Sequence, residues 1–205
     1  MSVRLPIYAA VAALALSPLA VVAQDAFTKE PAQVQAGTYE LDASHGKVTW
    51  AVNHFGFSTY VGQFSGTAGT LTLDAKAPTA SKLDVTVQTG SVGTLNEALD
   101  THLKSADFLD VAKFPTATFK ATSIKLTGKS TADVAGDLTL HGVTKPIVLK
   151  AVFNQAGINP VNKVYTVGFD GETTIKRTDF GITTYAPAIG DEVKLTIEAE
   201  FKKVG

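Results

Sequence analysis

The sequence predicts an all-β fold, an antiparallel barrel of about eight strands with one short helical insertion. Apolar and polar residues alternate in several stretches, most clearly from Val193 to Phe201, where every second residue is apolar. Turn signals rich in Gly, Pro, Asn and Asp separate these stretches. One short segment has its apolar residues at helical spacing instead. Alternation with period two is typical of strands that have one buried and one solvated face.

The alternating stretches recur along most of the chain. They lie at 48–54, 83–87, 134–140, 147–153, 165–169 and 193–201. An even number of such strands can close into a barrel, and closure removes the unpaired edges of a sheet. A two-sheet sandwich remains the structural alternative. A barrel of this size has room for packed side chains or for one small ligand, and periodicity does not decide between them.

The helical insertion is predicted near residues 95–104. The segment Thr94-Leu-Asn-Glu97 matches a capping box, in which the Thr94 side chain would cap the helix. Leu99 and Leu103 follow at a spacing of four residues, which places them on one helix face.

Residues 1–23 have the pattern of a cleavable secretory signal. Arg4 supplies a positive charge, an uncharged Ala/Leu/Val-rich stretch follows from residue 7 to 20, and Val21-Val22-Ala23 is a small-residue cleavage site. The sequence therefore predicts export from the cytoplasm and cleavage after Ala23. An uncleaved anchor is the alternative, because the apolar stretch nearly reaches the ~18 residues of a membrane span.

The rest of the chain is predicted to be one soluble domain. Residues 24–37 have no regular period and are expected to form a flexible leader, while 38–203 form the barrel domain. The chain has no Cys, which excludes disulfides, thiolate metal sites and a Cys-linked lipid anchor. Its formal charge of −1 with scattered Lys and Arg argues against nucleic acid as a partner. No second apolar run approaches spanning length, so no stable membrane anchor is expected after cleavage.

The sequence contains no local catalytic or metal-binding constellation. No two of the four His residues have metal-ligand spacing, and no nucleophile motif stands in its proper context. The protein is therefore predicted not to be an enzyme and to need no metal or cofactor. His54 lies two and four residues after Val52 and Trp50, so in a strand it is expected on the same inner face as they are. Three roles for His54 stay open: a hydrogen-bonded residue at the barrel rim, a contact to a ligand head group, or a metal ligand.

Three glycines interrupt the inward-facing positions, namely Gly62, Gly136 and Gly171. Strand glycines mark bulges or tight bends more often than they provide pocket volume. Both readings are compatible with a barrel.

Ordered blocks of residues resemble the YceI-like family of bacterial periplasmic, polyisoprenoid-binding proteins. The blocks are Tyr39-Glu-Leu-Asp42-x-x-His45-Gly-Lys-Val48-x-Trp50, Val52-Asn-His54-Phe-Gly-Phe57, Gly62-x-Phe64-x-Gly66, Ser91-Val-Gly-Thr94-x-Asn96, Asp100-x-His102-Leu103-Lys104-Ser-x-Asp107-Phe108, Phe114-Pro115-x-x-x-Phe119, Gly136-Asp-Leu138-Thr-Leu140-His-Gly142-Val-Thr144, Arg177-x-Asp179-Phe180-Gly181 and Gly190-Asp191-x-Val193. Together they cover about 38–203. One departure is Trp50, which stands where the family commonly has Phe.

The resemblance implies an elongated, lipocalin-like barrel with a helical lid and an apolar tunnel that holds a long isoprenoid chain, such as a quinone or a polyprenyl lipid. That lipid is the expected ligand and partner. The alternation of inner and outer faces along the strands, together with side-chain type, then predicts which residues line the tunnel. They are Trp50, Val52, His54, Phe57, Phe64, Leu99, Leu103, Phe108, Phe119, Leu138, Phe169 and Phe180.

The main functional prediction is therefore periplasmic binding of an isoprenoid lipid, in transport or storage. Two alternatives stay open: an enzyme that acts on a hydrophobic substrate, and a solid-core barrel that binds a partner through its outer surface. A homodimer through rim aromatics such as Tyr185 also stays open. A tunnel or a filled core inside the barrel would separate the binding protein from the solid-core alternative.

Overall fold

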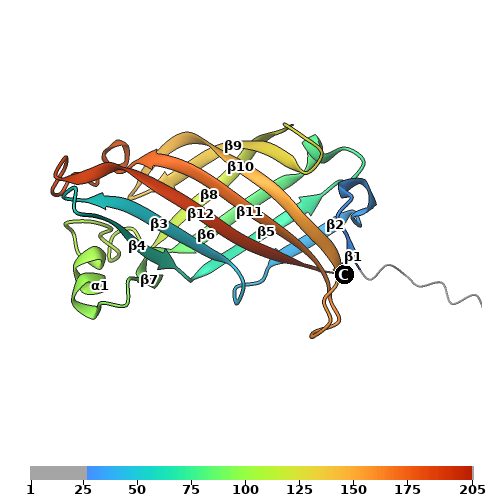
Figure 1. Ribbon diagram of the computed structural model, residues 1–205, viewed down its shortest axis with the longest axis horizontal. Helices are drawn as coiled ribbons and strands as arrows, with labels where there is room; N and C mark the ends of the chain where they lie inside the picture. Colours follow the sequence, from blue (N-terminus) through green and yellow to red (C-terminus); the bar gives the residue numbers. More distant parts are fainter. Residues whose placement is uncertain (1–26, 205) are drawn as a thin grey trace, which may run out of the picture.

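The computed structural model describes residues 27–204, and these form an elongated β-barrel with one α-helix at one end (Figure 1). The predicted signal segment 1–23 lies outside the described residues. Among those that are described, no helix is long and apolar enough to cross a membrane.

The regular elements follow the predicted order of strands and helix. The strands are β1 (Phe27–Thr28), β2 (Gly37–Leu41), β3 (Lys47–His54), β4 (Ser58–Phe64), β5 (Thr67–Leu73), β6 (Lys82–Gln88), β7 (Val92–Gly93), β8 (Thr116–Leu126), β9 (Thr131–Leu140), β10 (Val143–Ile158), β11 (Tyr165–Lys176) and β12 (Ile189–Lys203). The helices are α1 (Glu97–Lys104) and the short 3₁₀ turns η1 (Pro31–Gln33), η2 (Pro78–Ala80), η3 (Thr89–Ser91) and η4 (Arg177–Phe180).

Eight of the strands close into a barrel, which confirms the predicted fold class. Antiparallel pairing runs in the order β10–β9–β8–β6–β5–β2–β12, and β11 pairs with both β12 and β10 to complete the circle. The alternation predicted from sequence is present in the register. On β12, for example, Val193, Leu195 and Ile197 pair with the inward residues Val52, Trp50 and Val48 of β3.

Of the other four strands, β3, β4 and β7 continue the barrel wall toward α1, and β1 lies at the opposite end. The C-terminal part of β12 pairs with β2, whereas its N-terminal part pairs with β3, which continues into β4 and β7. Figure 1 shows β3, β4 and β7 at the end that carries α1.

The helix begins two residues later than its capping-box pattern suggests. Asn96, not Thr94, is the N-cap, and its side chain accepts a hydrogen bond from the backbone N–H of Leu99. Thr94 instead donates its hydroxyl and its backbone N–H to one carboxylate oxygen of Asp100, at 2.6 and 2.8 Å. Asp100 in the first turn therefore ties the helix back to the preceding strand.

The segment expected to be a flexible leader has regular structure from Phe27 onward. β1 pairs with β10, and η1 follows it across the end of the barrel opposite α1 (Figure 1). Val34 is buried in a core cluster with Tyr39, Leu71 and Phe201. The lack of periodicity is explained by this path, because a segment that crosses the end of a barrel has neither strand nor helix spacing.

Two of the three inward glycines make room for an aromatic ring on a neighbouring strand. A Cβ on Gly62 would lie 2.2 Å from the Trp50 ring, and one on Gly136 would lie 2.4 Å from the Phe119 ring. Next to Gly136, β8 also has a bulge, between Ala121 and Ser123. Close approach of a ring is therefore the main reason for glycine at these two positions.

Candidate ligand-binding cavity

The barrel interior contains a cavity of about 470 Å³. Its wall is made by the inward residues of the barrel strands, which are mostly Val, Leu, Ile, Ala and Phe. The charged residues that border it are Lys47, Lys129, Asp170, Arg177 and Glu198. Of these, only Arg177 is buried. The interior is thus hollow and apolar, which disagrees with the solid-core alternative.

Ten of the twelve residues predicted to line a tunnel border this cavity. They are Trp50, Val52, His54, Phe64, Leu99, Leu103, Phe108, Phe119, Leu138 and Phe169. They come from seven segments far apart in sequence, and closure of the barrel brings them together.

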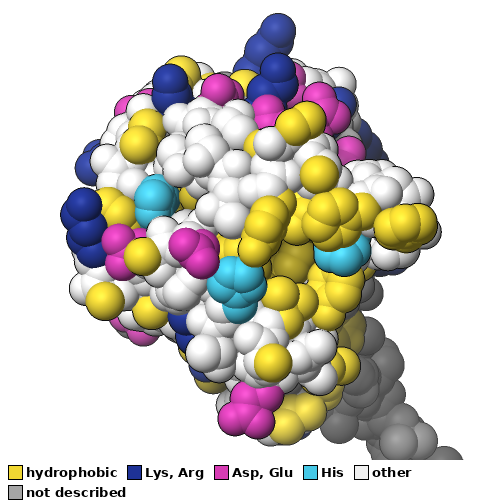
Figure 2. All heavy atoms as spheres, turned by 90° about the vertical axis from the view of Figure 1, so that its left-hand side faces the viewer, with side chains coloured by type: hydrophobic (Ala, Val, Ile, Leu, Met, Phe, Trp, Pro, Cys, Tyr) yellow, Lys and Arg dark blue, Asp and Glu magenta, His cyan; other side chains and the backbone are white. Residues whose placement is uncertain are grey.

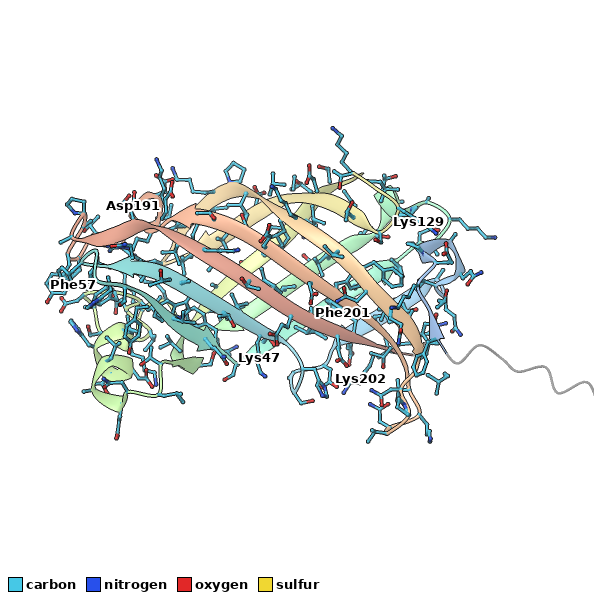
Figure 3. The ribbon with its side chains drawn as sticks, viewed as in Figure 1. Lys47, Phe57, Lys129, Asp191, Phe201 and Lys202 are labelled. Carbon is cyan, nitrogen blue, oxygen red and sulfur yellow. The ribbon has the colours of Figure 1, made fainter. Side chains whose placement is uncertain are left out.

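Phe57 and Phe180 do not border the cavity. Phe57 is 89 % exposed, because the β3–β4 turn, with positive φ at Phe55 and Gly56, directs it away from the barrel (Figure 3). Phe180 ends η4 and is fully buried outside the cavity, where its carbonyl oxygen lies 3.1 Å from His141 Nδ1. Both residues lie in turns, where the parity of a strand no longer applies.

The α1 end of the cavity is enclosed by side chains from three segments. Leu99 and Leu103 of α1 and Phe108 after it border the cavity from one side, and Ile182 of the loop before β12 and Ile189 at the start of β12 border it from the other. Trp50, Phe108 and Ile182 belong to one buried cluster. The helix is therefore a cover over this end, in agreement with the expected lid.

His54 lies at this end of the cavity among aromatic rings. Its ring centroid is 4.7 Å from that of Phe55 and 5.8 Å from that of Tyr60. Within the described part of the chain, no three His, Asp or Glu side chains come together as a metal site. This position agrees with a residue at the rim of the cavity, and contact of His54 to a ligand stays a prediction.

Arg177 is a buried residue of the site that strand parity does not reveal. Its guanidinium donates to four backbone carbonyls, those of Ile182, Thr184, Ile189 and Gly190, at 2.8 to 2.9 Å. Burial lowers the pKa of Arg177, and the charge of Asp191 opposes this shift. Arg177 thereby fixes the loop before β12 and the first two residues of that strand at the cavity end. A lone Arg directly after a long strand was the available sequence signal.

The opposite end of the cavity is bordered by Pro31 and Val34. The segment 30–35 is held in place by an ion pair and a hydrogen bond. Lys129 Nζ lies 2.8 Å from Glu30 Oε1, and Lys203 Nζ donates to Gln35 Oε1 at 2.8 Å. The Tyr39 hydroxyl donates to the carbonyl oxygen of Gln35. Burial raises the pKa of Tyr39 to about 12, with Tyr165 adding to the shift. Figure 3 shows Lys129 at this end and Phe57 at the other.

A comparison with family models matches residues 39–201 to the YceI-like domain. The chain belongs to the YceI-like family. A "UPF0312 protein" of Pseudomonas syringae pv. tomato is 44 % identical over 174 residues, which cover 83 % of this chain and 90 % of that protein. A UPF0312 protein of Pseudomonas aeruginosa is 41 % identical over 170 residues, covering 82 % and 88 % of the two chains.

Solved structures with this fold include other YceI-like proteins. The YCEI protein of Campylobacter jejuni is 30 % identical with a TM-score of 0.63, over 70 % of this chain and 85 % of that one. BcnA of Burkholderia cenocepacia has a TM-score of 0.71 at 21 % identity, over 78 % and 98 %. A polyisoprenoid-binding domain from Saccharophagus degradans has a TM-score of 0.62 at 15 % identity, over 83 % and 100 %, and so shares the fold.

Proposed function

We propose that this YceI-like protein binds a long isoprenoid lipid, such as a quinone or a polyprenyl lipid, in the cavity of its barrel, as a periplasmic carrier or store. The observation that carries the proposal is the apolar cavity of about 470 Å³, bordered at one end by α1 and at the other by η1. Apolar pockets of a few hundred Å³ with few polar groups are typical of sites for hydrophobic small molecules.

The chemistry of the wall selects a hydrocarbon chain. An isoprenoid tail offers methyl, methylene and methine surface, and burial of each such carbon contributes ~0.8 kcal/mol. A five-carbon unit thus contributes roughly 4 kcal/mol before the cost of ordering the chain. The Saccharophagus degradans domain, which shares this barrel fold, is described as polyisoprenoid-binding, and this supports the same class of ligand here.

Binding rather than catalysis is favoured by the groups around the cavity. The one buried charged side chain that borders it, Arg177, has four of its five N–H groups directed to backbone carbonyls. Within the described residues His54 lies beside the rings of Phe55 and Tyr60, and its ring makes no hydrogen bond to a carboxylate or hydroxyl that would mark it as a catalytic base. The wall formed by the described residues therefore provides a surface for a hydrocarbon chain rather than a set of groups that make or break bonds.

The location is inferred from residues 1–23. Their n-region, apolar stretch and small-residue cleavage site support export, and cleavage would release the barrel free in the periplasm. An isoprenoid is insoluble in water, so a soluble barrel would give it a path between the two membranes.

Trp50 provides a direct test, because it is the chain's single Trp and it borders the cavity. Titration with a short-chain ubiquinone is expected to quench Trp50 fluorescence saturably, with one molecule bound per chain. The same quinone ring without an isoprenoid tail serves as the control and is expected to bind far more weakly. Equal quenching by the tailed and tailless quinones, or no saturation, would contradict the proposal.

A further inference from the structure

Four exposed apolar side chains surround the α1 end of the cavity, and we call them the apolar rim: Phe55, Phe57, Leu95 and Tyr185. Their exposed fractions are 45, 89, 108 and 54 %. They come from the β3–β4 turn, the segment before α1 and the loop before β12. Figure 2, which looks at this end, shows hydrophobic side chains gathered around a hollow. Single exposed apolar residues are common, but a group around one opening indicates an interaction surface.

Three rim residues are held in a backbone conformation that bulky side chains rarely adopt. The φ angles of Phe55, Leu95 and Tyr185 are 54°, 65° and 58°. Each costs roughly 1–3 kcal/mol, and such residues cluster at functional sites. A turn that needed only a left-handed residue would be satisfied by Gly or Asn. The large apolar side chains at these positions therefore indicate a use for the side chains themselves.

The rim is attached firmly to the cavity. The Phe55 ring packs on His54, and the Tyr185 ring lies 6.2 Å from that of Phe108. His54 and Phe108 border the cavity. The Phe55 N–H donates to the carbonyl of Ala188 at 3.1 Å, which joins the two rim loops. At Phe55 and Tyr185 the apolar surface thus continues from the exposed rim to the cavity wall.

The charge around the rim is uneven. The β3–β4 turn with its flanking strand residues (53–61) and the residues 181–189 contain no Lys, Arg, Asp or Glu. On the other side of the opening, the segment 94–114 has four acidic residues and two lysines, a net charge of −2. The uncharged part of the apolar rim, with Phe55, Phe57 and Tyr185, can enter the boundary between head groups and acyl chains without desolvating an ion. The segment 94–114, with its net negative charge, does not attract anionic lipids.

We propose that the apolar rim inserts into the surface of a neutral phospholipid bilayer and places the end of the cavity against the membrane. Phe, Leu and Tyr are side chains that partition into the membrane interface, and Tyr keeps its hydroxyl among the head groups. A bilayer accepts separate protruding tips around an opening, whereas a second protein copy would have to match them in shape. The proposal goes beyond the proposed function, since it concerns the outer surface and not the ligand.

The test is flotation with phosphatidylcholine vesicles, using the chain from residue 24 onward so that the signal segment makes no contribution. This chain contains the whole closed barrel. The double variant Phe57→Ser/Leu95→Asn removes two rim side chains, and Asn tolerates the positive φ of Leu95. Val161→Ser is the matched control, because Val161 is also 89 % exposed but lies in the β10–β11 loop at the opposite end.

We expect the double variant to float with the vesicles at least about tenfold less than the unchanged chain, and the control to float as the unchanged chain does. Partial replacement of the neutral lipid by phosphatidylglycerol is expected to give no stronger binding. Quenching of Trp50 by short-chain ubiquinone in solution should be the same in all three proteins.

Unchanged flotation of the double variant, or no flotation of the unchanged chain, would overturn the proposal. Dimerisation that depends on the rim, seen by analytical ultracentrifugation without vesicle binding, would assign the rim to a second copy and would also overturn it. Loss of quinone binding alone would contradict the proposed function while leaving the membrane surface intact, so the two failures are distinguishable.

Discussion

The substitution Gly171→Leu places four carbon atoms inside the cavity with little disturbance of the wall. Gly171 lies on the inner face of β11, where it pairs with Ala151 of β10 and Ile197 of β12. A Cβ at this position would meet Ile197 Cβ at 3.5 Å and Lys150 O at 3.9 Å, which are ordinary contact distances. The leucine side chain therefore extends into the space that the ligand would use.

The expected effects on stability and on binding have opposite signs. Four CH₂-sized groups occupy the room of most of one isoprenoid unit, so binding loses about 3 kcal/mol, or roughly a hundredfold in Kd. The ligand-free protein gains stability by about 1–2 kcal/mol, because an apolar side chain fills apolar space and a strand interior loses a glycine.

The assay pairs urea unfolding of the ligand-free protein with Trp50 quenching by short-chain ubiquinone. Gly168→Leu is the matched control, since Gly168 lies on the same strand but faces outward, with only Gln155 O near its Cβ at 3.8 Å. The control is expected to bind the quinone as the unchanged protein does. Undiminished affinity in Gly171→Leu would refute the placement of the ligand inside the barrel.

Three further predictions concern stability. Arg177→Met leaves four backbone carbonyls without their donor and should lower the free energy of unfolding by at least about 3 kcal/mol, measured in urea; a loss below about 1 kcal/mol would contradict this role. Hydrogen bonds led by that from the Ser44 hydroxyl hold the pKa of the Asp42 carboxyl well below its usual range. Asp42→Asn should therefore lower the free energy of unfolding by about 1–3 kcal/mol at neutral pH. This difference from the unchanged protein should shrink as the pH falls below about 4, because the carboxyl of the unfolded chain then binds a proton. A difference that does not depend on pH would argue against these hydrogen bonds. Burial raises the pKa of Tyr39 to about 12, so the free energy of unfolding of the unchanged protein should fall as the pH rises from about 10 towards that value. The Tyr39→Phe variant should lose less stability over the same range. An equal loss of stability with pH in the two proteins would count against a buried Tyr39 hydroxyl.

The alternation of apolar and polar residues correctly predicted cavity-wall residues inside the strands. Trp50, Val52 and His54 on β3, and the inward series on β12, border the cavity as their alternation indicates. A period of two fixes which face of a strand is buried, and closure into a barrel makes every buried face point to one interior.

Parity fails where the chain leaves a strand. Phe57 follows a turn with positive φ, so its direction depends on that turn and not on the alternation of β3. Arg177 is a charged residue that pattern reasoning assigns to the surface, and its burial depends on carbonyls that are 5 to 13 residues away in sequence. Only the folded loop shows that four acceptors meet at one point.

The segment 27–36 shows a third limit of local patterns. Its contacts are long-range, with β1 on β10, Val34 in the core and Lys129 paired with Glu30. No local period reports such contacts. Packing against a distant part of the barrel gives this segment its structure.

Native mass spectrometry of the protein, purified without detergent from the cells that produce it, tests the central claim most directly. The account predicts one isoprenoid lipid per chain, identified by fragmentation, and its loss from the Gly171→Leu variant but not from Gly168→Leu. A chain that carries no lipid and takes up none from added ubiquinone or polyprenol would contradict it.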